Sequence, residues 1–258
     1  MTPKFKQLIE EIANAVTHGI GAILSITALC LMVYAVYIHQ EGPWHLAAVI
    51  VYGVSLILLY MMSTLYHSFF RLPKTAYVFK ILDHSAIYVL IAGTYTPFLW
   101  ITLRQGSGPF MSFLIWSLAL IGIVWQCFNV KRFHIIATLC YVAMGWLSVV
   151  LIPELKALLP WDAMVWLIIG GVSYTAGTVF YLWRRLPFQH AIWHIFVLAG
   201  VRPTSIVFTN LFYNLSVPCK KGFLFGKSFL HGLYDILNFP LILFFSKLLT
   251  ILRKSSIV

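Results

Sequence analysis

Long apolar segments separated by short polar breaks make up most of this chain. A membrane-spanning helix needs about 20 predominantly apolar residues, and six segments satisfy this requirement: 15–38, 46–66, 81–102, 110–128, 135–152 and 164–183. A seventh segment begins near His190 and continues toward Tyr213. The breaks carry turn-forming or charged residues, such as Glu41-Gly42-Pro43. The pattern predicts an all-α integral membrane protein, a seven-transmembrane helix bundle in one domain.

The composition narrows the class of protein further. Hydrophobic residues make up 61% of the 258 residues and charged residues 10%, and the mean hydropathy is +0.90, which is beyond the usage of soluble proteins. The net charge of +11 does not indicate nucleic acid, because basic residues between apolar spans are ordinary topology signals. The sequence carries no nucleotide-binding loop, heme-attachment motif or nucleic-acid-binding module. We therefore expect no nucleic-acid partner.

Two further features support a bundle of permanent spans. The first apolar segment follows Glu10-Glu11 and lacks an Ala-x-Ala cleavage site, so we expect it to remain in the protein. The four cysteines form no Cys-x-x-Cys pair, so we expect neither a disulfide framework nor a zinc ribbon.

The distribution of Lys and Arg predicts the orientation of the bundle. The short segments on one side of the membrane hold nine of them: Lys4, Lys6, Arg71, Lys74, Lys80, Lys131, Arg132, Arg184 and Arg185. The other side holds Arg104 and Lys156. Because basic loops remain in the cytoplasm, we expect a cytoplasmic N-terminus.

Four polar residues then fall at one membrane depth, near the cytoplasmic face. His67 ends the second span, Asp83 begins the third, and His190 and His194 open the seventh. The His-x-x-x-His spacing places two imidazoles on one helix face. Three neutral imidazoles and a water form a tetrahedral zinc site with one open position, where the pKa of the water falls to about 7. Asp83 is suited to orient that water or take its proton, and Ser63, one turn deeper than His67, to bind a polarised carbonyl.

Each of these residues also has a structural interpretation. A His-x-x-x-His pair alone is a weak signal, because histidine is common at membrane boundaries, and His67 alone could be anchored among headgroups. Asp83 alone could pair with one of three basic residues, Arg71, Lys74 or Lys80. The residues by themselves leave the metal site and the structural interpretation both open.

Other polar or helix-breaking positions are expected to be structural. His84 and His134 are predicted to lie at the membrane interface, and His39 and His45 lie on the opposite side and cannot join the site. Pro97 is predicted to kink the third span.

The polar residues also form motifs that occur in a fixed order: Glu11-x-x-Asn14-x-x-x-His18-Gly19, Ser63-x-x-x-His67, Asp83-His84, Ala92-Gly93-Thr94-Tyr95-Thr96-Pro97 and His190-x-x-Trp193-His194-x-Phe196-Val197-x-Ala199-Gly200. On these motifs the chain resembles bacterial hemolysin III proteins, which belong with the progestin and adipoQ receptors, over about residues 10–200. The resemblance implies seven helices, a cytoplasmic N-terminus and a zinc ion near the cytoplasmic face. It implies His67, His190 and His194 as ligands, Asp83 in contact with the water on zinc, and Ser63 nearby.

The resemblance also implies a function and a location. The wider superfamily includes alkaline ceramidases, so hydrolysis of a lipid amide is the expected chemistry, with Asp83 and Ser63 as catalytic residues and a membrane lipid as substrate. The bacterial plasma membrane is the expected location. Two alternatives remain: a pore-forming cytolysin, the activity behind the name hemolysin III, and a non-enzymatic receptor-like or membrane-homeostasis protein whose zinc is structural.

The chain departs from the family pattern after Gly200. The pattern continues with Ser-x-x-His-Phe or Ser-x-x-His-Tyr, whereas this sequence reads Val201-Arg202-Pro203-Thr204-Ser205. Arg202 falls about 18 Å along the helix from His190, near mid-bilayer, where Arg costs about 2.5–3.5 kcal/mol. We therefore divide the chain into a hemolysin III-like domain at 1–200 and an atypical apolar and basic tail at 201–258. The tail is expected to be either an eighth span near 236–251 or the product of a frameshift near Gly200.

Overall fold

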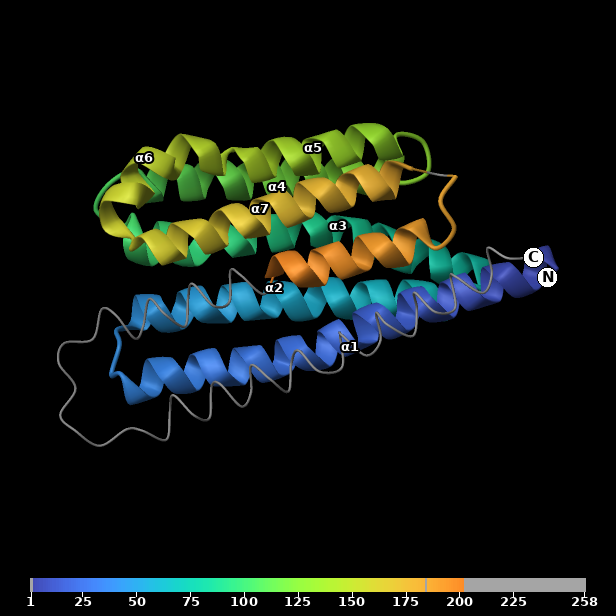
Figure 1. The fold of residues 1–258 in the computed structure, drawn as a ribbon, viewed down its shortest axis with the longest axis horizontal. Helices are drawn as coiled ribbons and strands as arrows, with labels where there is room; N and C mark the ends of the chain where they lie inside the picture. Colours follow the sequence, from blue (N-terminus) through green and yellow to red (C-terminus); the bar gives the residue numbers. More distant parts are fainter. Residues whose placement is uncertain (1, 184, 202–258) are drawn as a thin grey trace. The chain divides into compact units, whose positions relative to one another are not determined.

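The computed structural model describes residues 2–183 and 185–201, and within them the chain is all-helical (Figure 1). The elements are α1 (Pro3–Ile38), α2 (Pro43–Ser68), α3 (Pro73–Pro97), the π-helix η1 (Phe98–Thr102), α4 (Gly108–Asn129), α5 (His134–Trp146), α6 (Ser148–Leu158) and α7 (Trp161–Leu182). A shorter apolar helix, Gln189–Val201, follows α7. The predictions for Arg202, for the seventh span up to Tyr213, for the segment 236–251 and for the frameshift lie outside the described residues.

Six spans predicted from hydropathy are present. The structure has six helices that are long and apolar enough to cross a membrane, and α5 and α6 together form the fifth, His134–Leu158. The helices are longer than their apolar segments, and α1 begins at Pro3, well before the first apolar stretch. Four of them, α1 to α4, have Pro in the first turn. Proline suits this position because the N–H that it lacks would have no helical partner there.

The helix type of the third span changes at Pro97, where the sequence predicted a kink. The α-helix α3 ends at Pro97 and continues directly as the π-helix η1. Proline removes one backbone hydrogen bond and crowds the preceding turn, so the wider helix begins where the regular ladder is broken. The backbone N–H of Leu103 then donates to Phe98, which closes the π turn.

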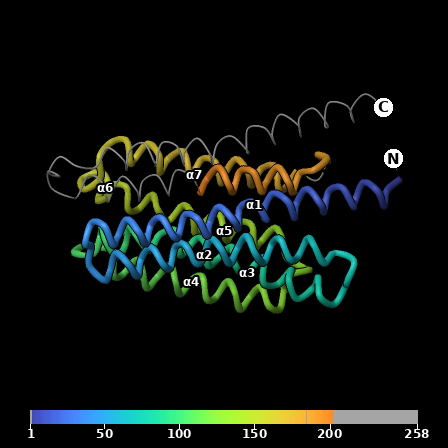
Figure 2. The backbone as a smooth tube through the Cα atoms, turned by 90° about the horizontal axis from the view of Figure 1, so that it is seen from below, coloured from blue at the N-terminus to red at the C-terminus, as the bar shows by residue number. Residues whose placement is uncertain are grey.

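The core of the bundle is centred on α2. Half of its most apolar window is buried, the largest share among the six spans. Helices α1 and α2 run side by side in both views (Figures 1 and 2). Glycines permit close contact here: a Cβ at Gly53 of α2 would lie 2.6 Å from Leu29 of α1, and one at Gly93 of α3 would lie 2.2 Å from Ser55 of α2. Exposed apolar side chains such as Ile23 cover the outer faces, as expected for helices in contact with lipid.

Because consecutive spans run in opposite directions, the connections gather at two ends of the bundle. The start of α1 lies at the same end as the connections α2–α3 and α4–α5 and the start of the helix Gln189–Val201 (Figure 1). We call this the histidine end, since it carries His67, His190 and His194. The connections α1–α2, η1–α4 and α6–α7 lie at the other end, which we call the Glu154 end. Residues far apart in sequence thus meet at one depth.

Candidate metal centre

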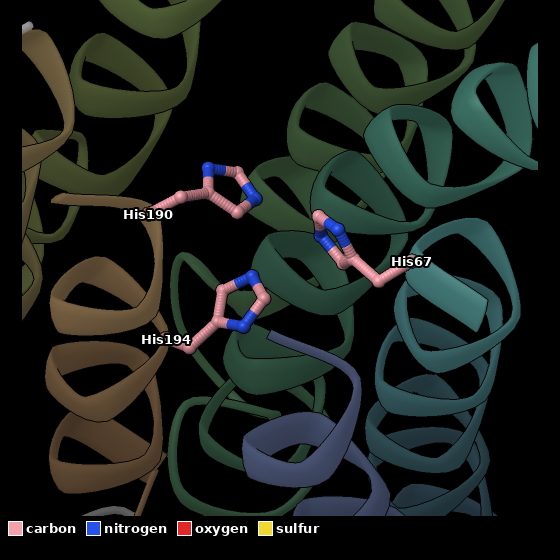
Figure 3. A group of neighbouring side chains, drawn as sticks. All are labelled: His67, His190 and His194. Carbon is pink, nitrogen blue, oxygen red and sulfur yellow. The ribbon is translucent and has the colours of Figure 1, made fainter. Parts of the chain in front are cut away.

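Three histidines meet at the histidine end of the bundle. His67 comes from the last turn of α2, and His190 and His194 come from the first turns of the helix Gln189–Val201. One ligand nitrogen from each lies within 4.8 Å of the others. Figure 3 shows the three rings turned toward one another from the two helices. The sequence prediction that these residues come together is therefore correct.

The burial and hydrogen bonding of these three histidines suit the binding of a metal ion. His67 and His194 are buried and His190 is half-buried. Among the described residues, Nε2 of His67 and Nε2 of His190 have no hydrogen-bond partner, although both atoms are buried. A buried polar atom without a partner is costly, and a cation would provide one for both nitrogens. Three imidazoles are the donor set of a catalytic zinc site.

Helix α1 contributes contacts that hold two of the three rings. Nδ1 of His67 lies 2.7 Å from Oε2 of Glu11, so its N–H can donate to that carboxylate and leave Nε2 for a metal. Nδ1 of His194 lies 3.0 Å from the hydroxyl of Thr17. Partners of this kind fix the tautomer and orientation of a ligand histidine. Glu11 and Thr17 therefore belong to the site.

Sequence reasoning did not assign a role to Glu11 or Thr17. Glu11 stood in the first family motif together with His18, seven residues later, and this spacing places both on one face of a helix. The motif therefore contained a signal, but the partner of Glu11 could not be read from it. The contact depends on how α1 packs against α2.

Asp83 and Ser63 are buried, Asp83 in the third turn of α3 and Ser63 one turn before His67 on α2. The group of ligand nitrogens within 4.8 Å does not include Asp83. Its Oδ2 lies 3.5 Å from Nδ1 of His84, and in the described part of the chain Asp83 pairs with this histidine and not with a lysine or arginine. His84 itself is buried within the bundle. The hydroxyl of Ser63 is fully buried and has no partner within residues 2–183 and 185–201.

His18 is a further polar residue beside the cluster. Its ring stacks on that of His194, with centroids 3.4 Å apart and planes at 14°. It is buried, and both of its ring nitrogens are without a hydrogen-bond partner in the described structure. His18 is part of the first family motif, but it was not predicted as a site residue from the sequence.

The similarity of this chain to known proteins agrees with its residues and fold. The model of the family described as Haemolysin-III related matches residues 6–202. Hemolysin-3 of Bacillus cereus is 50% identical over 218 residues, which cover 83% of this chain and 96% of that protein. The Hemolysin-3 homolog of Bacillus subtilis (strain 168) is 48% identical over 210 residues, 81% of this chain and 96% of the relative. Human Monocyte to macrophage differentiation factor is 29% identical over 196 residues, 73% of this chain and 78% of that protein.

The family match covers all three histidines of the cluster and the six apolar spans. Together with the bacterial relatives, the six helices identify a multi-pass bacterial membrane protein. The resemblance inferred from the motifs is thus confirmed, and the chain belongs to the Haemolysin-III related family.

Proposed function

We propose that this protein is a zinc-dependent hydrolase of lipid amides in the bacterial membrane. The observation that carries the proposal is the histidine cluster itself. Buried Nε2 atoms of His67 and His190 have no partner in the described structure, while Glu11 contacts Nδ1 of His67 and Thr17 contacts Nδ1 of His194. A purely structural group of histidines would be expected to satisfy its buried nitrogens with protein partners. In this cluster, one ligand nitrogen of each histidine lies within 4.8 Å of the others instead.

Each residue has a proposed part in the reaction. His67, His190 and His194 would hold the zinc ion, which when bound lowers the pKa of a water to about 7 and polarises a carbonyl. The carboxylate of Asp83 takes a proton from the attacking water and returns it to the amine nitrogen as the C–N bond breaks. The hydroxyl of Ser63 donates a hydrogen bond to the carbonyl oxygen as negative charge develops there.

The proposal includes an orientation and a route for the substrate. The excess of Lys and Arg at the histidine end favours a cytoplasmic N-terminus and a site on the cytoplasmic side. The helix Gln189–Val201 begins at that end and would be the first part of a seventh span. Because the site lies among helix ends within an apolar bundle, a lipid would reach it laterally from the bilayer.

Purified protein and its Asp83→Ala variant test the proposal. We expect both to bind zinc, because the three histidines remain, and we expect the variant to lose turnover of an N-acyl lipid. If the variant loses both its zinc and its turnover, Asp83 has a structural role instead. Equal turnover by the two proteins, or no zinc in either, would overturn the proposal.

A second candidate function is cytolysis, which the names of the two Bacillus relatives support, and pore formation is the mechanism proposed for it. It predicts leakage from liposomes that persists when His190 and His194 are both replaced by alanine. A hydrolase predicts no such leakage. A non-enzymatic protein with structural zinc predicts that the same replacement lowers stability and that no lipid is turned over.

A further inference from the structure

Helices α1 and α2 face each other across a set of buried polar side chains that lack partners. We call Asn14, His18, Tyr60 and Ser63 the polar stripe; each is at most 5% exposed. Among the described residues, no hydrogen-bond partner exists for Oδ1 of Asn14, either ring nitrogen of His18, the hydroxyl of Tyr60 or the hydroxyl of Ser63. Such atoms are costly in a membrane protein, where no bulk water can satisfy them. A ligand with polar atoms would supply the missing partners.

The polar stripe begins at the histidine cluster. The ring of His18 lies 3.4 Å from that of His194 and packs edge-on against the ring of Tyr60, at a centroid distance of 5.0 Å. Asn14 is four residues before His18 and lies on the same face of α1. Ser63 lies between Tyr60 and His67 on one face of α2. A molecule held at the three histidines would therefore have the polar stripe beside it.

The donors and acceptors of the stripe specify the chemistry of that molecule. Tyr60, Ser63 and a neutral His18 can each donate one hydrogen bond, whereas Oδ1 of Asn14 can only accept. A secondary amide matches both requirements, because its carbonyl oxygen accepts and its N–H donates. An ester has no N–H and would leave Oδ1 of Asn14 without a partner. Sites that bind a polar group in this way discriminate strongly against analogues that lack it.

We infer that the polar stripe is the subsite that recognises the amide group of the substrate. Oδ1 of Asn14 accepts the amide N–H, and a ring N–H of His18 donates to the carbonyl oxygen together with Ser63. The inference rests on the proposed function, and it adds the side chains that recognise the amide group and discriminate against the corresponding ester. It assigns direct substrate contacts to Asn14 and His18, which are not among the ligands of the cluster.

Two hydroxamates provide a test for Asn14. Dodecanohydroxamic acid carries a zinc-binding group with an N–H, and its N-methyl analogue lacks that N–H. Their dissociation constants are measured with the zinc-loaded full-length protein in detergent micelles. We expect wild type to prefer the N–H compound by about tenfold or more, the effect of one good hydrogen bond, and Asn14→Leu to lose that preference with unchanged zinc content.

Controls separate recognition from folding. Asn14→Asp still accepts from an N–H and should keep the preference. Ser25→Ala removes a buried hydroxyl on α1 that already bonds to the Gly21 carbonyl at 2.7 Å, and it should also keep the preference. A preference that survives in Asn14→Leu, or that Asn14→Asp loses to the same degree as Asn14→Leu, would overturn the inference.

His18→Phe tests the second contact. The substitution retains a ring against His194 and removes both nitrogens, so we expect both hydroxamates to bind about tenfold more weakly while zinc content stays the same. Unchanged affinity would remove His18 from the subsite.

A separate variant tests the metal proposal. If the hydroxamates bind equally well to wild type and to His190→Ala/His194→Ala, their binding does not depend on the histidine cluster, and the metal proposal is wrong.

Discussion

The two ends of the bundle both hold polar side chains, but they satisfy them differently. At the Glu154 end, the carboxylate of Glu154 accepts the backbone N–H of Ser107 at 3.2 Å and the Ser107 hydroxyl as well. Trp100 at the same end donates its ring N–H to the hydroxyl of Ser112. Thr102 is an exception there, since its buried hydroxyl has no partner in the described part of the chain.

At the histidine end, buried atoms without a described partner are concentrated. They belong to Asn14, His18, Tyr60, Ser63, His67, Ser85, Gln189 and His190. Glu11 and Thr17 contact Nδ1 of His67 and of His194, and Nε2 of His67 and of His190 is left without a partner in the described structure. Buried polar groups that stabilise a loop between helices are hydrogen-bonded within the protein. Buried polar groups of a binding site can instead be satisfied by the bound ligand. The Glu154 end is therefore structural, and the histidine end has the features of a binding site.

Removal of a ligand from the cluster should give the largest difference between the ends. His67→Ala deletes one of three nitrogens, so we expect zinc affinity to fall by more than the roughly 10–100-fold that the loss of an outer partner costs. Metal content and competition with a chelator measure this. His45→Ala is the matched control, because His45 pairs with Glu41 at 3.4 Å at the Glu154 end. If His67→Ala and His45→Ala lose zinc affinity equally, the two ends of the bundle do not differ in metal binding.

Glu11 should affect zinc binding less than a ligand but more than a neighbouring carboxylate. Glu11→Gln keeps the size of the side chain and removes the charge that holds Nδ1 of His67, so we expect zinc affinity to fall by about 10–100-fold. Glu10→Gln is the control, since Glu10 pairs with Lys6 at 4.0 Å and accepts a hydrogen bond from the backbone N–H of Phe188 at 3.5 Å, without a described contact to a ring of the cluster. If both substitutions leave zinc affinity unchanged, the contact of Glu11 with His67 does not position the ligand.

Substitution of Glu154 should lower the stability of the fold without changing metal binding. Glu154→Ala leaves the N–H and hydroxyl of Ser107 without their acceptor, so we expect a loss of about 1–2 kcal/mol in the free energy of unfolding. Thermal unfolding in detergent measures the loss, and zinc content should equal that of wild type. A variant that is fully stable, or that loses zinc, would contradict the structural role of this end.

Six spans could be predicted from the sequence because hydropathy is a local pattern, and the shared end of the three histidines followed from the order of the spans. Span length follows from bilayer thickness, and the spacing of His190 and His194 follows from helix geometry. Hydropathy could not locate the start of α1 at Pro3, because the first turns of that helix are polar. The contact of Glu11 with His67 and the burial of His84 depend on packing between helices, so neither could be read from the local pattern.

Two serines on α2 allow the smallest and most direct comparison between a satisfied and an unsatisfied hydroxyl. Ser55 donates to the carbonyl of Tyr52 at 2.7 Å, whereas Ser63 has no partner among the described residues, and both are buried. We expect Ser55→Ala to lower the free energy of unfolding by about 1 kcal/mol and Ser63→Ala to leave it unchanged or slightly raised, because removal of a hydroxyl without a partner also removes its desolvation cost. Thermal unfolding of the two variants side by side measures the difference. If Ser63→Ala is the more destabilised of the two, its hydroxyl is bonded within the protein and is not available to a substrate.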